Sequence, residues 1–561
     1  MNAAEIIVNS LEKHGVEYIF GVPGGAIEPL NTALYKSMIK VIVAKHEQGA
    51  AFMADGYARV SGSIAVCCST AGPGATNMLT GIASANGDSI PVIALTGQVS
   101  TSLFGKGAIQ EFAIQSFGIV SMFRQITKYS DIVINEKKAG EMIAKARRLA
   151  LTGRKGPVHL NLPADIMKRD VEDSWDRCSI TQAMGFDRDG VQEAARLLLH
   201  AKNPVIIAGW GTVLSQADER LLELAELMDI PVATSPKAKG ILSEAHPLSL
   251  GVLGFAGSPV SREYILQRDI DVMLAVGTSF NEFVTSGWDN RLRPMQSLIQ
   301  IDIDCNEIGK NYYVDVGIVG DAKTVLHELI HALLRMHKSR QAASDTRRRE
   351  IQSIRERTKP KTSKKQALYS PRNVIRDLAG CLPEDTIYFV DNGNSMAWAI
   401  HYLTITRPYS FYVGLGFASM GFATAASVGA KLAAGDRPVV ALVGDGAFLM
   451  NGMEVATAVN YNIPVIWVVM NNSMLGMVYH GRKLAAIPEG IPSRFKPVDF
   501  AQLATALGAR GIRITKPAEL TKELLDGIIA DKIPTVLDVI IDPEETPPIH
   551  SRIASLEKLY T

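Results

Sequence analysis

Two apolar stretches decide the fold of this chain: Val439-Val-Ala-Leu-Val-Gly-Asp-Gly446 and Pro464-Val-Ile-Trp-Val-Val-Met-Asn-Asn472. Each is a short run rich in β-branched residues that stops at glycine or asparagine, which predicts a buried strand ending in a tight turn. The intervening segment, Met450 to Tyr461, has the length of a helix. In a right-handed strand–helix–strand unit both strands end at the same edge of a parallel sheet, so we expect Asp445 and Asn472 to lie side by side.

This sheet edge has the chemistry of a metal and phosphate site. The carboxylate of Asp445 and the carboxamide oxygen of Asn472 suit a hard cation such as Mg²⁺, which takes its remaining oxygens from waters and from a ligand's phosphates. The flanking Gly444 and Gly446 let backbone N–H groups approach phosphate closely. An isolated Gly-Asp-Gly is usually only a turn. Here a second strand ends in Asn471-Asn472 at the same edge, and this combination makes a binding site the better interpretation.

The overall composition is that of an ordinary globular protein. The 561 residues are too many for a single core and indicate several domains. Hydrophobic residues make up 47% and charged residues 20%, and a formal net charge of +1 provides no bulk field for nucleic acid or membrane. Five cysteines without CxxC spacing argue against a disulfide framework or a zinc site. No signal peptide or long apolar run is present, so we expect a cytoplasmic protein with no membrane partner.

Strands and helices alternate along the chain, which predicts an α/β fold of three doubly wound parallel-sheet domains. We expect a first domain over residues 1–170, a middle domain over 188–336 and a third domain over 367–561. Residues 337–366 are polar and mostly basic. They lack the aromatic interleaving of a nucleic-acid patch, so we interpret them as a solvated basic linker and expect no nucleic-acid partner.

The first domain carries two glycine-rich turns and an acidic helix start. Gly21 to Gly25 follows a short strand, and Gly72 to Asn77 opens a helix, where N–H groups and the helix dipole favour an anion or a carbonyl oxygen. Glu47 begins another helix. An isolated glutamate at a helix start is usually an exposed carboxylate. Only its setting among the other motifs indicates a functional role for Glu47.

Taken in order, these motifs resemble the thiamine diphosphate (ThDP)-dependent decarboxylase superfamily and, more closely, the acetolactate synthase (acetohydroxyacid synthase) family. The resemblance covers nearly the whole chain. It is carried by the Gly-Asp-Gly and Asn-Asn pair and by Gly21–Ala26, His46–Ala50, Ala71–Asn77, Gly97–Val99, Gln110–Glu111 and Gly476–Val478. It implies a pyrimidine-binding first domain and a diphosphate-binding third domain. It also implies a homo-oligomer, dimer or tetramer, with the active site between subunits.

The resemblance implies which residues hold ThDP and Mg²⁺. Asp445, Asn472 and the backbone carbonyl of Met474 would bind the metal. Met420 would be the apolar wedge that bends the cofactor. The other cofactor contacts would be Asn394, Ser395, Ala418, Gly444, Gly446, Ala447, Leu475, Gly476 and Met477.

The implied reaction is decarboxylation of a 2-oxo acid, most simply pyruvate, followed by carboligation to a second carbonyl. Glu47 would hydrogen-bond the pyrimidine ring of the cofactor. Gly25 and Gln110 would lie near the reacting carbon. A catalytically silent subunit would have lost Glu47 or a metal ligand, and neither is lost.

The acceptor pocket departs from the acetolactate synthase pattern. After Gly-Met-Val the family carries Gln-Trp-Gln, whereas Gly481 stands here in place of the tryptophan. A pocket with Val478, His480 and Gly481 is therefore expected to be roomier. The alternative to an acetolactate synthase is a sibling carboligase or lyase that uses an aldehyde, sulfoacetaldehyde or a natural-product intermediate. His480 is either a proton donor near neutral pH or a satisfied histidine with no part in the reaction.

The middle domain departs from the family in its flavin site. The family holds FAD with arginines in a Gly-Ala-Arg-Phe-Asp-Asp-Arg segment, and the corresponding Gly277 to Phe283 contains no arginine. Without those donors a flavin diphosphate would be poorly held, so we expect no FAD, or only weak binding. The turn Gly209-Trp-Gly211 lacks the third glycine of a dinucleotide fingerprint and is interpreted as a plain strand–helix turn.

Overall fold

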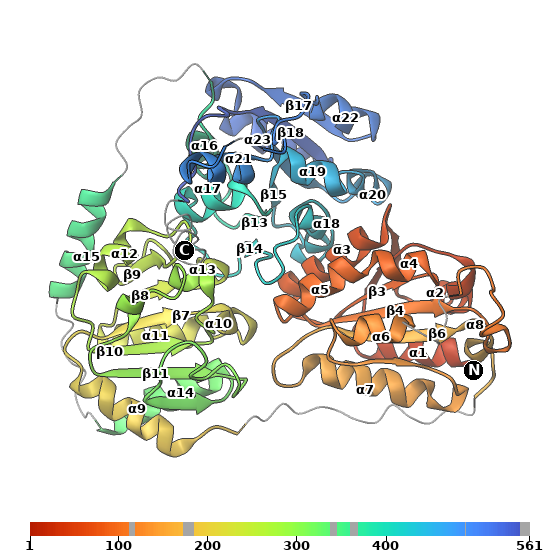
Figure 1. The fold of residues 1–561 in the computed structure, drawn as a ribbon, viewed down its shortest axis with the longest axis horizontal. Coiled ribbons are helices and arrows are strands. Elements are labelled where there is room, and N and C mark those ends of the chain that lie inside the picture. The colour runs from red at the N-terminus through yellow and green to blue at the C-terminus, as the bar shows by residue number, and fades with distance from the viewer. Residues whose placement is uncertain (112–117, 172–184, 337–344, 360–367, 489, 550–561) are drawn as a thin grey trace.

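The computed structural model describes residues 1–111, 118–171, 185–336, 345–359, 368–488 and 490–549. It contains three six-stranded sheets, and neighbouring strands in each sheet are parallel. Figure 1 shows the first domain on the right, the middle domain on the left and the third domain at the top. The predicted α/β fold of three parallel-sheet domains is confirmed. Among the helices of the described ranges, none is long and apolar enough to cross a membrane.

The first domain has the strand order β2-β1-β3-β4-β6-β5. Its strands are β1 (Tyr18–Gly21), β2 (Lys40–Val43), β3 (Ala65–Ser69), β4 (Val92–Gln98), β5 (Ser130–Ile132) and β6 (Val158–Pro163). Its longer or site-forming helices are α1 (Ala3–Lys13), α2 (Glu28–Tyr35), α3 (Glu47–Ser61), α4 (Pro73–Asn77), α5 (Leu79–Gly87), α6 (Ile119–Arg124) and α7 (Ala139–Leu151). Strands β3, β4 and β6 are buried along their whole length because helices cover both faces of the sheet.

The third domain repeats this topology with the order β14-β13-β15-β16-β18-β17. Its strands are β13 (Ile387–Val390), β14 (Phe411–Val413), β15 (Val439–Gly444), β16 (Val465–Asn471), β17 (Arg510–Ile514) and β18 (Thr535–Ile540). Its helices include α16 (Pro371–Cys381), α17 (Asn394–Tyr402), α18 (Phe422–Ala434), α19 (Asp445–Asn451), α20 (Glu454–Asn460), α21 (Gly476–Leu484), α22 (Phe500–Ala506) and α23 (Lys522–Asp531). The single helix expected between β15 and β16 is thus divided in two at Gly452.

The middle domain has a different strand order, β12-β11-β10-β7-β8-β9. Its strands are β7 (Val205–Ala208), β8 (Val232–Thr234), β9 (Ser249–Val252), β10 (Val272–Val276), β11 (Ser297–Asp302) and β12 (Val316–Val319). Its helices include α9 (Arg188–His200), α11 (Asp218–Met228), α12 (Pro259–Leu266) and α14 (Ala322–Met336). This is the order of dinucleotide-binding sheets, in which the strand order reverses between β7 and β10.

Part of the segment interpreted as a linker is helical. Helix α15 (Asp345–Thr358) packs on the middle domain through Ile351 and Ile354, which share one face at i,i+3 spacing and are buried. Arg355 donates to the carbonyls of His246 (2.7 Å) and Ser249 (2.6 Å). Residues 345–358, which were predicted from composition to be part of a solvated linker, are thus attached to the middle domain by two buried isoleucines and by hydrogen-bonding arginines. The remaining residues of the predicted linker lie largely outside the described ranges.

The first and third domains share one hydrophobic core. Helices α3 and α18 cross closely because Gly56 and Gly429 lie at the crossing, where a side chain on either would strike the backbone of the other helix. Phe52 and Phe422 meet edge to face beside it, with ring centroids 5.5 Å apart. This shared core fixes the two domains relative to each other in one chain (Figure 1).

A buried charge cluster joins all three domains. Asp88 accepts hydrogen bonds from Arg59 (2.8 Å), from Lys237 of the middle domain (2.9 Å) and from the backbone N–H of Gly416 in the third domain (2.9 Å). Asp55 pairs with the same Arg59. Two acids face two bases, so no charge is buried without a partner. The cluster anchors the start of the loop that leads from β14 to α18.

Candidate cofactor site

The strand ends that were predicted to meet do so in the middle of the third domain's sheet. Strands β15 and β16 pair in parallel, so Asp445 and Asn472 follow neighbouring strands at one edge. The Asp445 carboxylate accepts hydrogen bonds from the backbone N–H groups of Gly446 (2.7 Å), Asn472 (2.9 Å) and Ser473 (2.6 Å). These bonds fix the orientation of the carboxylate.

The oxygens at this edge suit a hard cation. Asp445 is 2% exposed, and burial raises the pKa of its carboxyl to about 6, against the opposing effect of the backbone N–H groups. Asn472 and Met474 line the same cavity and supply an amide and a carbonyl oxygen. Across the described ranges no three His, Cys, Asp or Glu side chains gather into a metal site. A metal here would therefore combine one carboxylate with neutral oxygens, an arrangement that Mg²⁺ accepts when phosphates complete the shell.

A cavity of about 90 Å³ lies at this sheet edge. Every residue predicted to hold the cofactor lines it except Ala418, which is exposed and has a φ of 56°. The predicted residues that line it are Asn394, Ser395, Met420, Gly444, Asp445, Gly446, Ala447, Asn472, Met474, Leu475, Gly476 and Met477. The cavity is also lined by residues that the sequence motifs did not indicate, namely Asn392, Gly393, Trp398, Met470 and Ile541. The run Asp-Asn-Gly-Asn at the end of β13 is the signal that could have found the first two.

The cavity fits a diphosphate. Gly393 and Gly444 leave open space where a Cβ would stand, so a ligand can approach their backbone. A Cβ at Gly476 would lie 2.5 Å from the side-chain nitrogen of Asn394. The Oδ1 atoms of Asn392 and Asn394 are buried and have no hydrogen-bond partner among the described residues. Buried acceptor oxygens without partners are costly, and a hydrogen-bond donor or a cation bound together with the diphosphate would satisfy them.

Met420 reaches the cavity from the loop between β14 and α18. Asn392 donates from Nδ2 to the carbonyl of Ser419 at 2.9 Å. Asp391 accepts from the backbone N–H of Gly421 at 2.9 Å, and burial raises the pKa of Asp391 to about 7. The residues that follow β13 thus hold both sides of Met420, which keeps an apolar side chain at the wall of a polar cavity.

In the first domain, the helix-start glutamate is buried. Glu47 is 8% exposed, and its Oε2 accepts a hydrogen bond from Asn77 Nδ2 at 3.0 Å. A Cβ on Gly74 would lie 3.2 Å from Glu47 Oε1 and 2.9 Å from Thr70. The glycine-rich turn therefore closes directly over the carboxylate. This excludes the interpretation of Glu47 as an exposed carboxylate.

Gln110 and Gly25 flank the same turn. A Cβ on Gly72 would lie 2.9 Å from the carbonyl oxygen of Gln110, which itself has a φ of 61°. Gly25 begins a short 3₁₀ turn after β1 and has open space where a Cβ would stand. Its neighbour Gly24 packs against Thr70, where a Cβ would lie 2.5 Å away. The structure thus brings the predicted catalytic residues of the first domain to one place.

Comparison with known proteins agrees with this geometry. Family models described as the N-terminal TPP binding, central and C-terminal TPP binding domains of thiamine pyrophosphate enzymes match residues 1–117, 191–329 and 391–539. The chain belongs to the thiamine pyrophosphate (ThDP) enzyme family. The three matches follow the order of the three sheets, with TPP binding assigned to the first and third domains.

Curated relatives within this family are acetolactate synthases. A probable acetolactate synthase large subunit of Methanocaldococcus jannaschii is 38% identical, over 98% of this chain and 93% of its own length. An acetolactate synthase of Mycobacterium bovis is 35% identical over 96% of this chain and 88% of its own. The Escherichia coli acetolactate synthase isozyme 1 large subunit is 34% identical, with 97% and 94% covered. The protein is a ThDP-dependent enzyme of the acetolactate synthase type.

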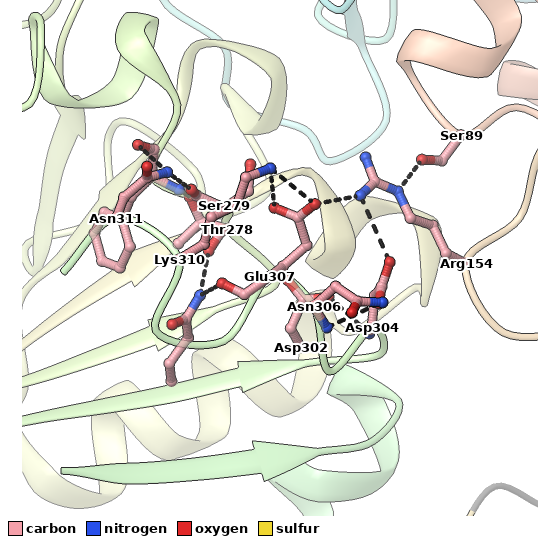
Figure 2. A network of polar contacts seen from close by, with 12 residues as sticks. Ser89, Arg154, Thr278, Ser279, Asp302, Asp304, Asn306, Glu307, Lys310 and Asn311 are labelled. Atoms are coloured by element: carbon pink, nitrogen blue, oxygen red, sulfur yellow. Dashed lines mark hydrogen bonds and ion pairs between the residues drawn. The ribbon is translucent and has the colours of Figure 1, made fainter. Parts of the chain in front are cut away.

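A larger cavity, of about 640 Å³, lies where the middle domain of this ThDP enzyme meets the other two domains, and Arg154, Trp210, Gly277 and Asp302 help to line it. Figure 2 shows the polar network beside it. Arg154 lies 2.8 Å from Glu307 and donates to the Ser89 hydroxyl at 2.9 Å. Burial raises the pKa of Asp302 to about 6.

The segment expected to lack a flavin-binding cation lines an adjoining cavity of about 90 Å³. From this segment Thr278, Ser279 and Asn281 reach the cavity with hydroxyl and amide groups. Arg154, which lines both cavities, is already paired with Glu307. There is room for a nucleotide-sized ligand, but the charge that a flavin diphosphate needs is not supplied by Gly277 to Phe283.

The three residues expected in the substrate pocket separate in the structure. Val478 lines the diphosphate cavity and is 44% exposed, whereas His480 and Gly481 do not line it. His480 is 1% exposed, and burial lowers the pKa of its imidazole, which is therefore neutral near pH 7. This environment disfavours the interpretation of His480 as a proton donor to substrate.

Proposed function

We propose that the protein is an Mg²⁺- and ThDP-dependent carboligase that converts two molecules of pyruvate into 2-acetolactate and CO₂. The observation that carries the proposal is the convergence of Asp445, Asn472 and Met474 on one cavity at a parallel sheet edge. Relatives described as acetolactate synthases support the choice of reaction. We further infer a cytoplasmic location, since the cysteines of the described residues are free thiols and fit a reducing compartment.

The third domain would hold the cofactor by its diphosphate. Asp445, Asn472 and the carbonyl of Met474 would bind Mg²⁺, which takes its other oxygens from the diphosphate and water. Asn394 would contact the diphosphate, and Met420 would pack against the cofactor body. When bound, ThDP supplies an electron sink for the loss of CO₂. The residues of this chain bind and orient it and keep water away from the reacting carbon.

Glu47 would hold the proton that activates the cofactor. Its Oε2 is fixed by Asn77, so Oε1, under the Gly72–Asn77 turn, would share a proton with the pyrimidine ring nitrogen. Positioned proton transfer of this kind is worth about 10²–10⁴-fold in rate. Gly25, with open space where a side chain would stand, leaves room for the second substrate, and Gln110 contacts the glycine-rich turn at Gly72.

The complete site would form between two copies of the chain. The cavity is lined by residues of the third domain, and none of the described first-domain residues lines it. Leu449, Met450 and Met453, on and just after α19, are 49–55% exposed, which favours burial against another subunit. A homodimer, or a tetramer built from such dimers, would bring a second first domain to each cavity.

The same enzyme would work without FAD. The segment from Gly277 to Phe283 offers no cation, and Arg154 is engaged by Glu307. We expect freshly purified protein to show no flavin absorbance, and added FAD to leave turnover unchanged. About one equivalent of flavin per chain would contradict this part of the proposal.

The test of the proposed function is product identification by NMR with ThDP, Mg²⁺ and pyruvate, without added flavin. The proposal predicts 2-acetolactate and CO₂. Pyruvate consumption only in the presence of an aldehyde or another acceptor would favour a sibling carboligase, the alternative suggested by Gly481 in place of the family's tryptophan. No turnover of pyruvate under any of these conditions would overturn the assignment of the donor.

A further inference from the structure

The side chain of His480 lies behind the cofactor cavity rather than in it. The residue sits on α21 and is almost completely buried. Its Nδ1 lies 2.9 Å from the side-chain nitrogen of Asn394 and 2.9 Å from the carbonyl oxygen of Gly476, one helical turn earlier. Asn394 and Gly476 both line the cavity, and His480 does not. The imidazole therefore touches the wall of the site from outside.

The carboxamide nitrogen of Asn394 makes the contact with His480, whereas the carboxamide oxygen, Oδ1, is buried and makes no hydrogen bond to the described residues. A carboxamide keeps its shape when its oxygen and nitrogen exchange places, so either end can face the cavity. An anion selects the orientation in which the N–H groups face it. That orientation requires a donor for the oxygen on the opposite side, which is where His480 lies.

We propose that His480 is a positioning residue that holds the Asn394 carboxamide in the orientation that donates to the diphosphate of ThDP. This inference rests on the proposed function, because it needs ThDP in the third-domain cavity. The carbonyl oxygen of Gly476, an acceptor 2.9 Å from Nδ1, favours the tautomer of neutral imidazole that carries its proton on Nδ1. In that tautomer Nδ1 pairs with the oxygen of the carboxamide and leaves the N–H groups to face the cavity. Gly476 makes the contact possible, since a Cβ there would lie 2.5 Å from the Asn394 side chain.

The test uses the different reach of asparagine and glutamine. An asparagine at position 480 places its amide near the position of Nδ1, and a glutamine places it near Nε2. Since the contacts are made by Nδ1, His480→Asn is expected to keep the dissociation constant of Mg²⁺–ThDP within about 2-fold of the parent. His480→Gln and the apolar His480→Leu are expected to raise it about 3–10-fold, the usual scale of one hydrogen bond. Binding is measured by isothermal titration calorimetry on the full chain without substrate.

A double-mutant cycle separates positioning from a general effect on folding. If His480 acts through Asn394, His480→Gln produces no further weakening in an Asn394→Ala background. Tyr479→Phe is the matched control, because Tyr479 is the neighbouring residue on α21 and its hydroxyl bonds to Glu544 rather than to Asn394. This variant is expected to bind like the parent, and thermal unfolding without cofactor checks that all variants are folded.

Four results would overturn the inference. Equal affinity of His480→Gln, His480→Leu and the parent would show that the contact does not matter for binding. Equal weakening of ThDP binding by His480→Asn and His480→Gln would show that the contacts of Nδ1 are not what matters. An undiminished effect of His480→Gln in the Asn394→Ala background would show that His480 does not act through Asn394. Absence of ThDP binding by the parent itself would overturn the proposed function and this inference with it.

Discussion

The third and middle domains offer the same kind of sheet edge and use it differently. In the third domain the strand order reverses between β13 and β15, and in the middle domain between β7 and β10. Ligands bind at such switch points in open parallel sheets. In the third domain the loops leave two buried asparagine oxygens without a hydrogen-bond partner among the described residues, and Asp445 lines a cavity. In the middle domain the two turns close on each other, with Gly211 N–H donating to Gly277 O at 2.9 Å.

The acidic side chains at the two sheet edges also differ in whether the protein pairs them with cationic side chains. Asp445 is oriented by backbone N–H groups and has no cationic side chain paired with it among the described residues. In the middle domain Glu307 is bonded by Arg154 at 2.8 Å and approached by Lys310 at 3.4 Å (Figure 2). The topology of the sheet thus fixes where a ligand can bind. The side chains decide whether the position is open to a cation and a diphosphate or already satisfied by the protein.

The largest expected loss of cofactor binding separates the two edges directly. Asp445→Asn removes the only carboxylate of the proposed metal site, and we expect Mg²⁺-dependent ThDP binding to weaken about 100-fold or more. Asp302→Asn makes the same change at the end of β11 in the middle domain, and should leave binding and turnover within about 3-fold of the parent. Calorimetry and steady-state rates check both. A comparable loss in Asp302→Asn would remove the distinction between the domains.

A second variant tests the first domain's share in the site. Glu47→Gln keeps the shape and the Asn77 contact but cannot hold the same proton, so we expect turnover to fall about 10²–10⁴-fold with ThDP binding largely intact. Glu28→Gln is the matched control, because Glu28 is also in the first turn of a helix of this domain but is exposed. Normal turnover of Glu47→Gln would show that the assignment of Glu47 is wrong.

The smallest effect concerns stability and pH. Burial raises the pKa of Asp302 from 3.8 to about 6 in the folded protein, so the folded state holds a proton that the unfolded chain releases. This contribution to stability is present at low pH and is lost as the pH rises through about 6. Asp302→Asn should therefore stabilise the protein by about 1–3 kcal/mol near pH 7.5 and by much less near pH 4.5. Denaturant unfolding of parent and variant at both values measures the difference, and a pH-independent difference would contradict the account.

Short-range sequence pattern was sufficient for the three sheets and for the meeting of Asp445 with Asn472. Both follow from strands that stop at polar residues and from the handedness of strand–helix–strand units. Ile541 joins the cavity only because β18 lies beside β16, and strand order is not written in local sequence. The burial of Ile351 and Ile354 was hidden for the same reason, since two isoleucines in a basic segment do not reveal which surface they cover.

The location of His480 could not be predicted either. The position of the His480 side chain depends on the direction in which α21 leaves the loop after Asn472. In the structure the histidine lies on the face of α21 that contacts Asn394. The cluster of Asp88, Arg59 and Lys237 was equally hidden, because its members come from separate domains and match no motif. Long-range contacts of this kind depend on the packing of domains, whereas motifs report on single strand ends.

The most direct test of the account is complementation between two inactive variants. If each site combines Glu47 of one chain with Asp445 of another, a mixed dimer of Glu47→Gln and Asp445→Asn contains one intact site. Co-expression with random pairing should then restore about 25% of the parent's activity, although each variant alone is nearly inactive. Activity that stays at the level of the separate variants, with mixed dimers demonstrated by mass spectrometry, would contradict a site shared between the first and third domains of different chains.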